Sequence, residues 1–188
     1  MGNWNEKAEE IMKERFGRDS VISLATAVSG TPYVRPVNAY YEGGSFYVIT
    51  YALSRKMDQI KENDIVAISG EWFSGHGRAI NLGYFGKDNN AAIAGKLKKA
   101  FDEWIDNGHM NLNDENTIIL EIKIIDAVLM SHGVRYELLG HADEGKHDKI
   151  VNRSIYTKAD RLNQTTTIFV VVQIRPSSLG QSGSSSAV

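Results

Sequence analysis

Residues 46–63 read FYVITYALSRKMDQIKEN, an apolar run that passes directly into a helical pattern. The aromatic and β-branched residues of Phe46–Tyr51 predict a strand. Ser54 is a candidate helix N-cap, and Arg55 and Lys56 follow in the first helical turn. Cations are unfavourable there because the helix dipole is positive at its N-terminus. The stretch therefore indicates either a site for an external anion or a solvated helix start with two surface cations.

Two more strand-like stretches precede this run. Ser20–Val28 is rich in β-formers, and Tyr33–Tyr41 follows it after the turn residues 29–32. Glu42, Gly43 and Gly44 then lead into the strand at residues 45–51. Strands joined by such short glycine-containing turns predict an antiparallel meander.

The rest of the first 137 residues adds three predicted strands and two predicted helices. The strands are expected at 65–69, 78–85 and 117–130, and the helices at 4–16 and from Asp88 to just before Gly108. Residues 70–77, rich in glycine and aromatic side chains, are expected to form a loop. Six antiparallel strands with helices at the margins predict a small closed barrel, mainly β with flanking helices, of the α+β class.

Composition excludes several classes of function. The chain has 188 residues, a net charge of −2 and no cysteine, so disulfides, thiolate nucleophiles and Cys-ligated metals are ruled out. No basic excess favours nucleic acid, and no apolar stretch approaches the ~20 residues of a membrane helix. His141 and His147 lack a metal-ligand spacing, so no metal is expected. A soluble, cytoplasmic protein is predicted.

Arg35-Pro36-Val37-Asn38 interrupts the second predicted strand with a proline. Proline has no N–H for a sheet ladder, so it belongs on an edge or at a bulge, where nearby backbone groups are free for a ligand. The planar fork of Arg35 suits a phosphate. In a meander, Arg35 and the helix start at Ser54 would converge on one phosphate; the alternative is a surface arginine beside an edge-strand proline.

Taken together, these segments resemble the pyridoxamine 5′-phosphate oxidase-like flavoproteins in order and spacing. The matching residues are Ala25-Thr26, Val34–Asn38, Tyr47–Thr50 and Ser54–Asn63. The resemblance implies a six-stranded antiparallel split β-barrel that binds FMN and forms a homodimer with the flavin at the subunit interface. It extends over about residues 19–136.

The resemblance is greatest to the general-stress-protein branch, which also has segments like Trp72–Gly77 and Ser131–Tyr136. It implies that Arg35 and Lys56 bind the FMN phosphate, with Arg55 and Ser54 assisting. It also implies that Pro36, Val37 and Asn38 follow the isoalloxazine edge and that Ile49 and Thr50 line the floor beneath the ribityl and phosphate groups. Gln59 matches a family glutamine.

Two departures from the oxidase proper argue against pyridoxamine phosphate oxidation. Tyr40 stands where that enzyme has a lysine for the substrate phosphate, and residues 132–136 replace its Arg-x-His-x-Arg-like segment. Residues 138–188 form an atypical extension, either lineage-specific or non-native, with an apolar strand-like run at 165–174 and a Ser/Gly-rich end that is expected to be disordered.

The function expected from the resemblance is that of an FMN-dependent oxidoreductase that moves two electrons to or from a small molecule, with NAD(P)H as the donor. The alternative is a non-catalytic, stress-related carrier of flavin or haem. No catalytic residue is assigned. Trp72, His76, His132 and Arg135 either approach the flavin or have structural roles in loops and interfaces.

Overall fold

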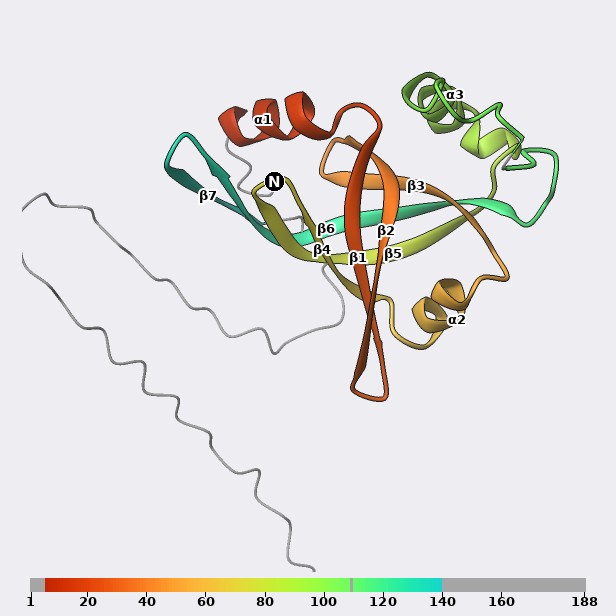
Figure 1. Ribbon diagram of the computed structural model, residues 1–188, viewed down its shortest axis with the longest axis horizontal. Coiled ribbons are helices and arrows are strands. Elements are labelled where there is room, and N and C mark those ends of the chain that lie inside the picture. Colours follow the sequence, from red (N-terminus) through yellow and green to blue (C-terminus); the bar gives the residue numbers. More distant parts are fainter. Residues whose placement is uncertain (1–5, 109, 140–188) are drawn as a thin grey trace, which may run out of the picture. The chain divides into compact units, whose positions relative to one another are not determined.

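Within residues 6–108 and 110–139, which this computed structural model describes, the chain forms one antiparallel sheet of seven strands (Figure 1). Their order is β3-β2-β1-β4-β5-β6-β7. The strands are β1 (Ser20–Val28), β2 (Thr31–Glu42), β3 (Ser45–Tyr51), β4 (Ile65–Gly70), β5 (Phe73–Tyr84), β6 (Thr117–Ser131) and β7 (Val134–Leu139).

Pairing between β3 and β6 closes the first six strands into a barrel. The register runs from Ser45 opposite Lys123 to Tyr51 opposite Thr117. The predicted six-stranded antiparallel barrel is therefore confirmed, and closure leaves these two strands without open edges along the paired stretch. One strand was not predicted: β7 folds back onto β6 through a turn in which Gly133 adopts a φ of 74°.

In the described part of the chain, three α-helices flank the barrel: α1 (Glu6–Phe16), α2 (Arg55–Glu62) and α3 (Ala91–Ala100). Figure 1 shows α2 beside the β1–β2 hairpin, on the side of the barrel away from α1 and α3. The helix predicted to reach Gly108 ends earlier, because Phe101 leaves the helical conformation with φ −108° and ψ 21°. A short 3₁₀ turn (Asp88–Asn90) precedes α3.

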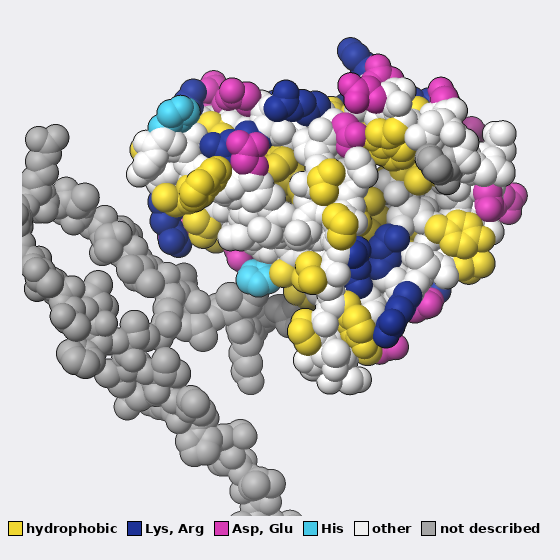
Figure 2. All heavy atoms as spheres, in the orientation of Figure 1, with side chains coloured by type: hydrophobic (Ala, Val, Ile, Leu, Met, Phe, Trp, Pro, Cys, Tyr) yellow, Lys and Arg dark blue, Asp and Glu magenta, His cyan; other side chains and the backbone are white. Residues whose placement is uncertain are grey.

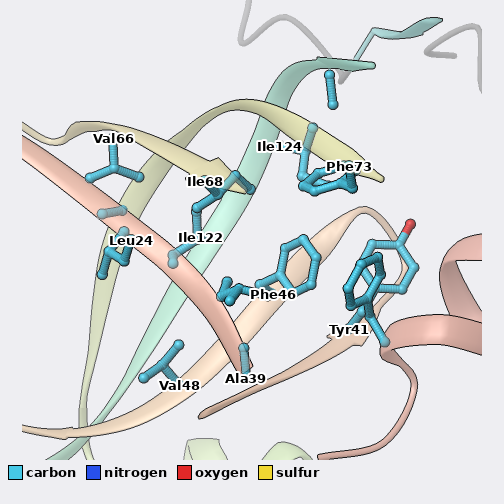
Figure 3. Packing of buried hydrophobic residues seen from close by; sticks show 14 of the residues in the cluster. Leu24, Ala39, Tyr41, Phe46, Val48, Val66, Ile68, Phe73, Ile122 and Ile124 are labelled. Carbon is cyan, nitrogen blue, oxygen red and sulfur yellow. The ribbon is translucent and has the colours of Figure 1, made fainter. Parts of the chain in front are cut away.

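The barrel is filled by apolar side chains that alternate along its strands (Figure 3). Aromatic rings from three elements meet edge to face at one end: the Phe16 and Phe46 centroids lie 5.5 Å apart, and those of Tyr41 and Phe46 lie 5.3 Å apart. A second buried cluster under α3 contains Leu97, Phe101 and Ile119.

Residues 70–77, expected to form a loop, are mostly strand. A two-residue turn at Glu71 and Trp72 joins β4 to β5, and Trp72 adopts a φ of 51°. Gly75 and Gly77 then lie inside β5. A Cβ on Gly75 would lie 2.3 Å from the carbonyl oxygen of Asp126, so this glycine permits the close approach of β6 rather than a loop.

A β-bulge in β6 changes which residues face outward. His76 lies opposite Asp126 and Gly77 lies opposite Ile124, so Ile125 is the extra residue. Ile124 is buried on one side of the bulge and Ala127 on the other. The bulge thereby places Asp126 on the outer face beside His76.

Strand β7 runs to Leu139, and Leu138 is fully buried in the core. The barrel therefore includes these two residues beyond Glu137, where the domain was expected to end. The rest of the expected extension, with its strand-like run and its Ser/Gly-rich end, lies outside the described residues. Among the described helices, none is both long and apolar enough to span a membrane.

Candidate anion-binding site

Basic side chains gather where α2 meets the β1–β2 hairpin (Figure 2). Arg35 extends from β2, and Arg55 and Lys56 occupy the first turn of α2. The side chain of Asn63, at the end of α2, donates a hydrogen bond of 3.2 Å to the carbonyl oxygen of Ala27. This contact joins α2 to the hairpin. The two elements border the corner in which Arg35, Arg55 and Lys56 lie.

Arg35 is held in place by a partly buried hydrogen-bond network. Its Nη2 donates to Gln59 Oε1 at 2.6 Å, and its Nη1 donates to Thr26 Oγ1 at 2.8 Å and to the Leu24 carbonyl at 3.3 Å. The Thr26 hydroxyl donates to the same Gln59 oxygen at 2.7 Å. A guanidinium has five N–H donors, so two remain for a ligand after these three bonds.

The three cations have no counter-charge in this part of the chain. Among the described residues, no carboxylate forms an ion pair with Arg35, Arg55 or Lys56. Burial, and then the charge of Arg35, lowers the pKa of Lys56. Burial, and then the charge of Arg55, lowers the pKa of Arg35. Both shifts mean that the corner disfavours its own positive charge and is suited to a bound anion.

Two buried hydroxyl groups in the segment that leads into α2 lack partners. Thr50 Oγ1 and Ser54 Oγ are both enclosed and form no hydrogen bond. Ser54 occupies the N-cap position, and its carbonyl accepts from the N–H groups of Met57 and Asp58 at 2.8 and 3.2 Å, but its hydroxyl does not cap the helix. Since buried polar atoms are nearly always satisfied, these two hydroxyls point to a missing ligand.

Pro36 lies on a free sheet edge, as predicted. Strand β2 pairs with β1 along its length, with Ser23 opposite Pro36, but pairs with β3 only from Tyr40 to Glu42. The backbone of residues 31–39 is therefore open on one side. Val37 packs against the core, and the Asn38 side chain donates to Asp19 Oδ1 at 2.8 Å, so at this edge Asn38 offers only its backbone.

The predicted floor residues face opposite ways. Thr50 is buried with an unpaired hydroxyl, whereas Ile49 packs in the cluster under α3 with Phe85 and Leu97. Successive side chains of a strand point to opposite faces, which explains the separation. Thr50 thus offers a polar group near the start of α2, whereas Ile49 packs beneath α3 on the opposite face.

Sequence reasoning missed Tyr33. The guanidinium carbon of Arg55 lies 4.8 Å from the centre of the Tyr33 ring. Tyr33 precedes Arg35 by two residues on β2, so the alternation of a strand places both on one face. That spacing was the available signal. The roles of Gln59 and Thr26 as holders of Arg35 also emerge only from the structure.

The other residues of open role lie elsewhere. Trp72 and His132 occupy the β4–β5 and β6–β7 turns. Arg15 of α1 donates to the carbonyl of Glu71 in the first turn and to that of Met130 near the end of β6. His76 Nδ1 lies 2.9 Å from Asp126 Oδ1 at a hollow of about 420 Å³ on the outer face of the barrel. Arg135 pairs locally with Glu137 at 3.1 Å, and both side chains are exposed.

Comparison with known proteins shows a likeness of fold. Neither a family model nor a curated protein matches the sequence. Among solved structures, an FAD-binding protein from Mesorhizobium loti superposes with a TM-score of 0.51 at 16% identity, covering 63% of this chain and 90% of the other. General stress protein 26 from Bacillus anthracis gives 0.50 at 16% identity, covering 69% and 92%.

A proposed pyridoxamine 5′-phosphate oxidase from Listeria innocua also gives a TM-score of 0.50, at 12% identity over 65% of this chain and 94% of the other. The described barrel thus has the fold of these structures, the antiparallel split β-barrel that the sequence predicted. At these identities the likeness concerns the fold alone, and chemistry resides in the side chains of the site.

Proposed function

We propose that this chain binds FMN through its phosphate at the corner between the β1–β2 hairpin and α2, and that it works as an FMN-dependent oxidoreductase. The observation that carries the proposal is a set of three cations without a carboxylate partner among the described residues, next to a segment with two unpaired buried hydroxyls. The split-barrel fold and the described neighbour that binds FAD support a flavin as the ligand.

The phosphate end of FMN fits the donors of this corner. Arg35 has two N–H groups left, Lys56 offers its ammonium group, and Ser54 has a free hydroxyl. The first N–H groups of α2 add partial positive charge. A phosphate monoester is close to a dianion at neutral pH, and charge-assisted hydrogen bonds to it are strong.

The free edge of β2 suits the ring end of the cofactor. The backbone groups of residues 36–38 that face away from β1 are open to a planar heterocycle with hydrogen-bonding edges. Bound flavin supplies two-electron, hydride-type chemistry. The residues of this chain would bind and orient it, and the substrate would be a small molecule with NAD(P)H as electron donor.

A second copy of the chain would complete the site. A ring at an open sheet edge is exposed to water unless another surface covers it. Val21 and Val34 on the outer face of β1 and β2 are 64% and 71% exposed, which favours an apolar partner surface there. We therefore propose a homodimer with the flavin at the interface.

Flavin titration of the purified chain tests the proposal. Lys56→Met should weaken FMN binding by about 1–3 kcal/mol, or roughly fivefold to 150-fold, the cost of losing a charged hydrogen bond. Lys61→Met is the matched control, since Lys61 lies on the same helix, is exposed and pairs with Asp58. Equal FMN affinity in both variants would overturn the assigned site.

Anaerobic mixing of the FMN complex with NADH or NADPH then distinguishes an oxidoreductase from a flavin carrier. Loss of the oxidised flavin absorption, and its return when a quinone is added, would support the oxidoreductase. Tight FMN binding without reduction by either nucleotide, or by any supplied donor, would leave a flavin carrier.

A further inference from the structure

Tyr33 and Arg55 form a stacked pair across the gap between β2 and α2. The Arg55 guanidinium carbon lies 4.8 Å from the ring centre of Tyr33, within the range of a cation–π contact. Arg55 has no carboxylate partner among the described residues. Because the ring covers one face of the guanidinium, the N–H groups along its edge stay available to a ligand.

The stack is continuous with the network that holds Arg35. Tyr33 lies directly opposite Thr26 in the β1–β2 register, and the Thr26 hydroxyl accepts from Arg35. Gln59, one turn along α2 from Arg55, accepts from Arg35 as well. The hairpin therefore helps to position both arginines: Arg35 through partly buried hydrogen bonds that it shares with α2, and Arg55 through an aromatic face.

Arg55 needs such a holder more than Arg35 does. It is exposed, and it lies close enough to Arg35 for its charge to lower the pKa of that guanidinium. Repulsion and side-chain entropy would both favour an arginine that turns away into water. Stacking on Tyr33 offsets this before any ligand arrives, which is preorganisation of a binding group.

We propose that Tyr33 is a specificity-determining positioning residue that holds Arg55 at the mouth of the phosphate corner and so selects phosphorylated flavin over riboflavin. The inference rests on the proposed function. Since Tyr33 acts through the charge of Arg55, its contribution is confined to the phosphate, and it leaves binding of the flavin ring unchanged.

Parallel titrations with FMN and riboflavin test this role. Tyr33→Leu should weaken FMN binding about threefold to tenfold, from loss of the cation–π contact and of preorganisation, with riboflavin affinity unchanged. Tyr33→Phe keeps the ring face and should bind FMN as the wild type does. Arg55→Lys keeps the charge but loses the planar stack, so it should resemble Tyr33→Leu and serves as a second variant if Tyr33→Leu does not fold.

A double-mutant cycle separates positioning from a structural role. Tyr33→Leu combined with Arg55→Met should bind FMN no more weakly than Arg55→Met alone. A merely structural Tyr33 would instead lower affinity for both flavins equally and give additive losses, which would overturn the inference. If the wild type shows no preference for FMN over riboflavin, the proposed function fails too; if the preference survives Tyr33→Leu and Arg55→Lys, only this inference fails.

Discussion

Arg35 on β2 and Gln59 on α2 are joined by a hydrogen bond of 2.6 Å between Nη2 and Oε1. The same amide oxygen accepts from Thr26, so one buried carbonyl group fixes an arginine, a strand hydroxyl and a helix relative to one another. The hydrogen bond thereby fixes the orientation of the Arg35 guanidinium as a hydrogen-bond donor.

Gln59→Leu is expected to destabilise the protein and to weaken FMN binding. The substitution removes the acceptor of two hydrogen bonds in a side chain only 6% exposed, and a cost of about 1–3 kcal/mol is typical when buried donors lose their partner. Urea unfolding measures the stability and fluorescence titration the affinity. Asp58→Asn, at an exposed position of the same helix, should change neither, and an unaltered FMN affinity in Gln59→Leu would show that Arg35 does not depend on it.

Thr50→Val should have opposite effects on stability and on binding. The Thr50 hydroxyl is buried and unpaired, so an isosteric apolar replacement removes an unsatisfied group and should leave the free energy of unfolding unchanged or higher, while FMN affinity falls. Thr117→Val is the matched control: Thr117 is also buried, but its hydroxyl donates to the Asn111 carbonyl at 2.7 Å. The control should lose about 1–3 kcal/mol of stability in urea unfolding. Equal destabilisation of both variants would contradict the assignment of Thr50.

As the pH rises into the alkaline range, FMN affinity should begin to fall at a pH below the ordinary pKa of lysine. Burial and the charge of Arg35 lower the pKa of Lys56 from 10.5, and only the charged amine attracts phosphate. On the acid side, affinity should rise as the phosphate loses its second proton, near pH ~6. Lys56→Arg should abolish the alkaline decline because arginine stays protonated. Dissociation constants measured from about pH 6 to about pH 10 check both limbs, and an identical alkaline limb in Lys56→Arg would contradict the role of Lys56.

The lowered pKa of Lys56 also determines how the stability of the protein without ligand changes with pH. A cation with a lowered pKa in the folded state binds fewer protons there than in the unfolded chain, just below pH 10.5. The contribution of Lys56 to the free energy of unfolding should therefore increase as pH rises through that window. Comparing the wild type with Lys56→Met by urea unfolding across the window isolates this contribution, which should be missing from the variant.

Gly75→Ala should destabilise the barrel, whereas Gly95→Ala should not. A Cβ at residue 75 would lie 2.3 Å from the Asp126 carbonyl oxygen, so β5 and β6 would have to separate. At residue 95, in the middle of α3, nothing lies within 4 Å of the added carbon, and alanine is expected to stabilise the helix by about 0.5–1 kcal/mol. Thermal melting of the two variants should shift in opposite directions, and a Gly75→Ala protein as stable as the wild type would refute the close approach.

The barrel strands were largely predictable from local sequence. The strand Ser45–Tyr51 is bounded by Gly43-Gly44 before it and by the helix start at Ser54, and the structure has it at the predicted residues. The glycines at 75 and 77 misled the prediction, because local sequence does not reveal that a neighbouring strand needs their missing side chains. A glycine that admits a neighbour and a glycine that bends the chain look alike until the partner strand is known.

The charged residues of the candidate site were predictable from the sequence, but the contacts that hold them in place were not. Arg35, Arg55 and Lys56 were found because strand–helix order and proline chemistry are local signals. The bond from Arg35 to Gln59 and the stack of Tyr33 on Arg55 depend on how the hairpin meets α2, which is a tertiary relationship.

At the bulge beside His76, Ile125 is the residue of β6 that has no partner on β5. If β6 alternated regularly through Ile125, Asp126 and Val128 would turn into the apolar interior, and Ala127 and Leu129 would turn out to solvent. The bulge absorbs this odd residue, so both halves of the strand keep their apolar side chains inward. Deleting Ile125 would remove the bulge and leave the same side chains facing the interior, whereas adding one residue within a regular stretch of the strand would invert the part beyond it.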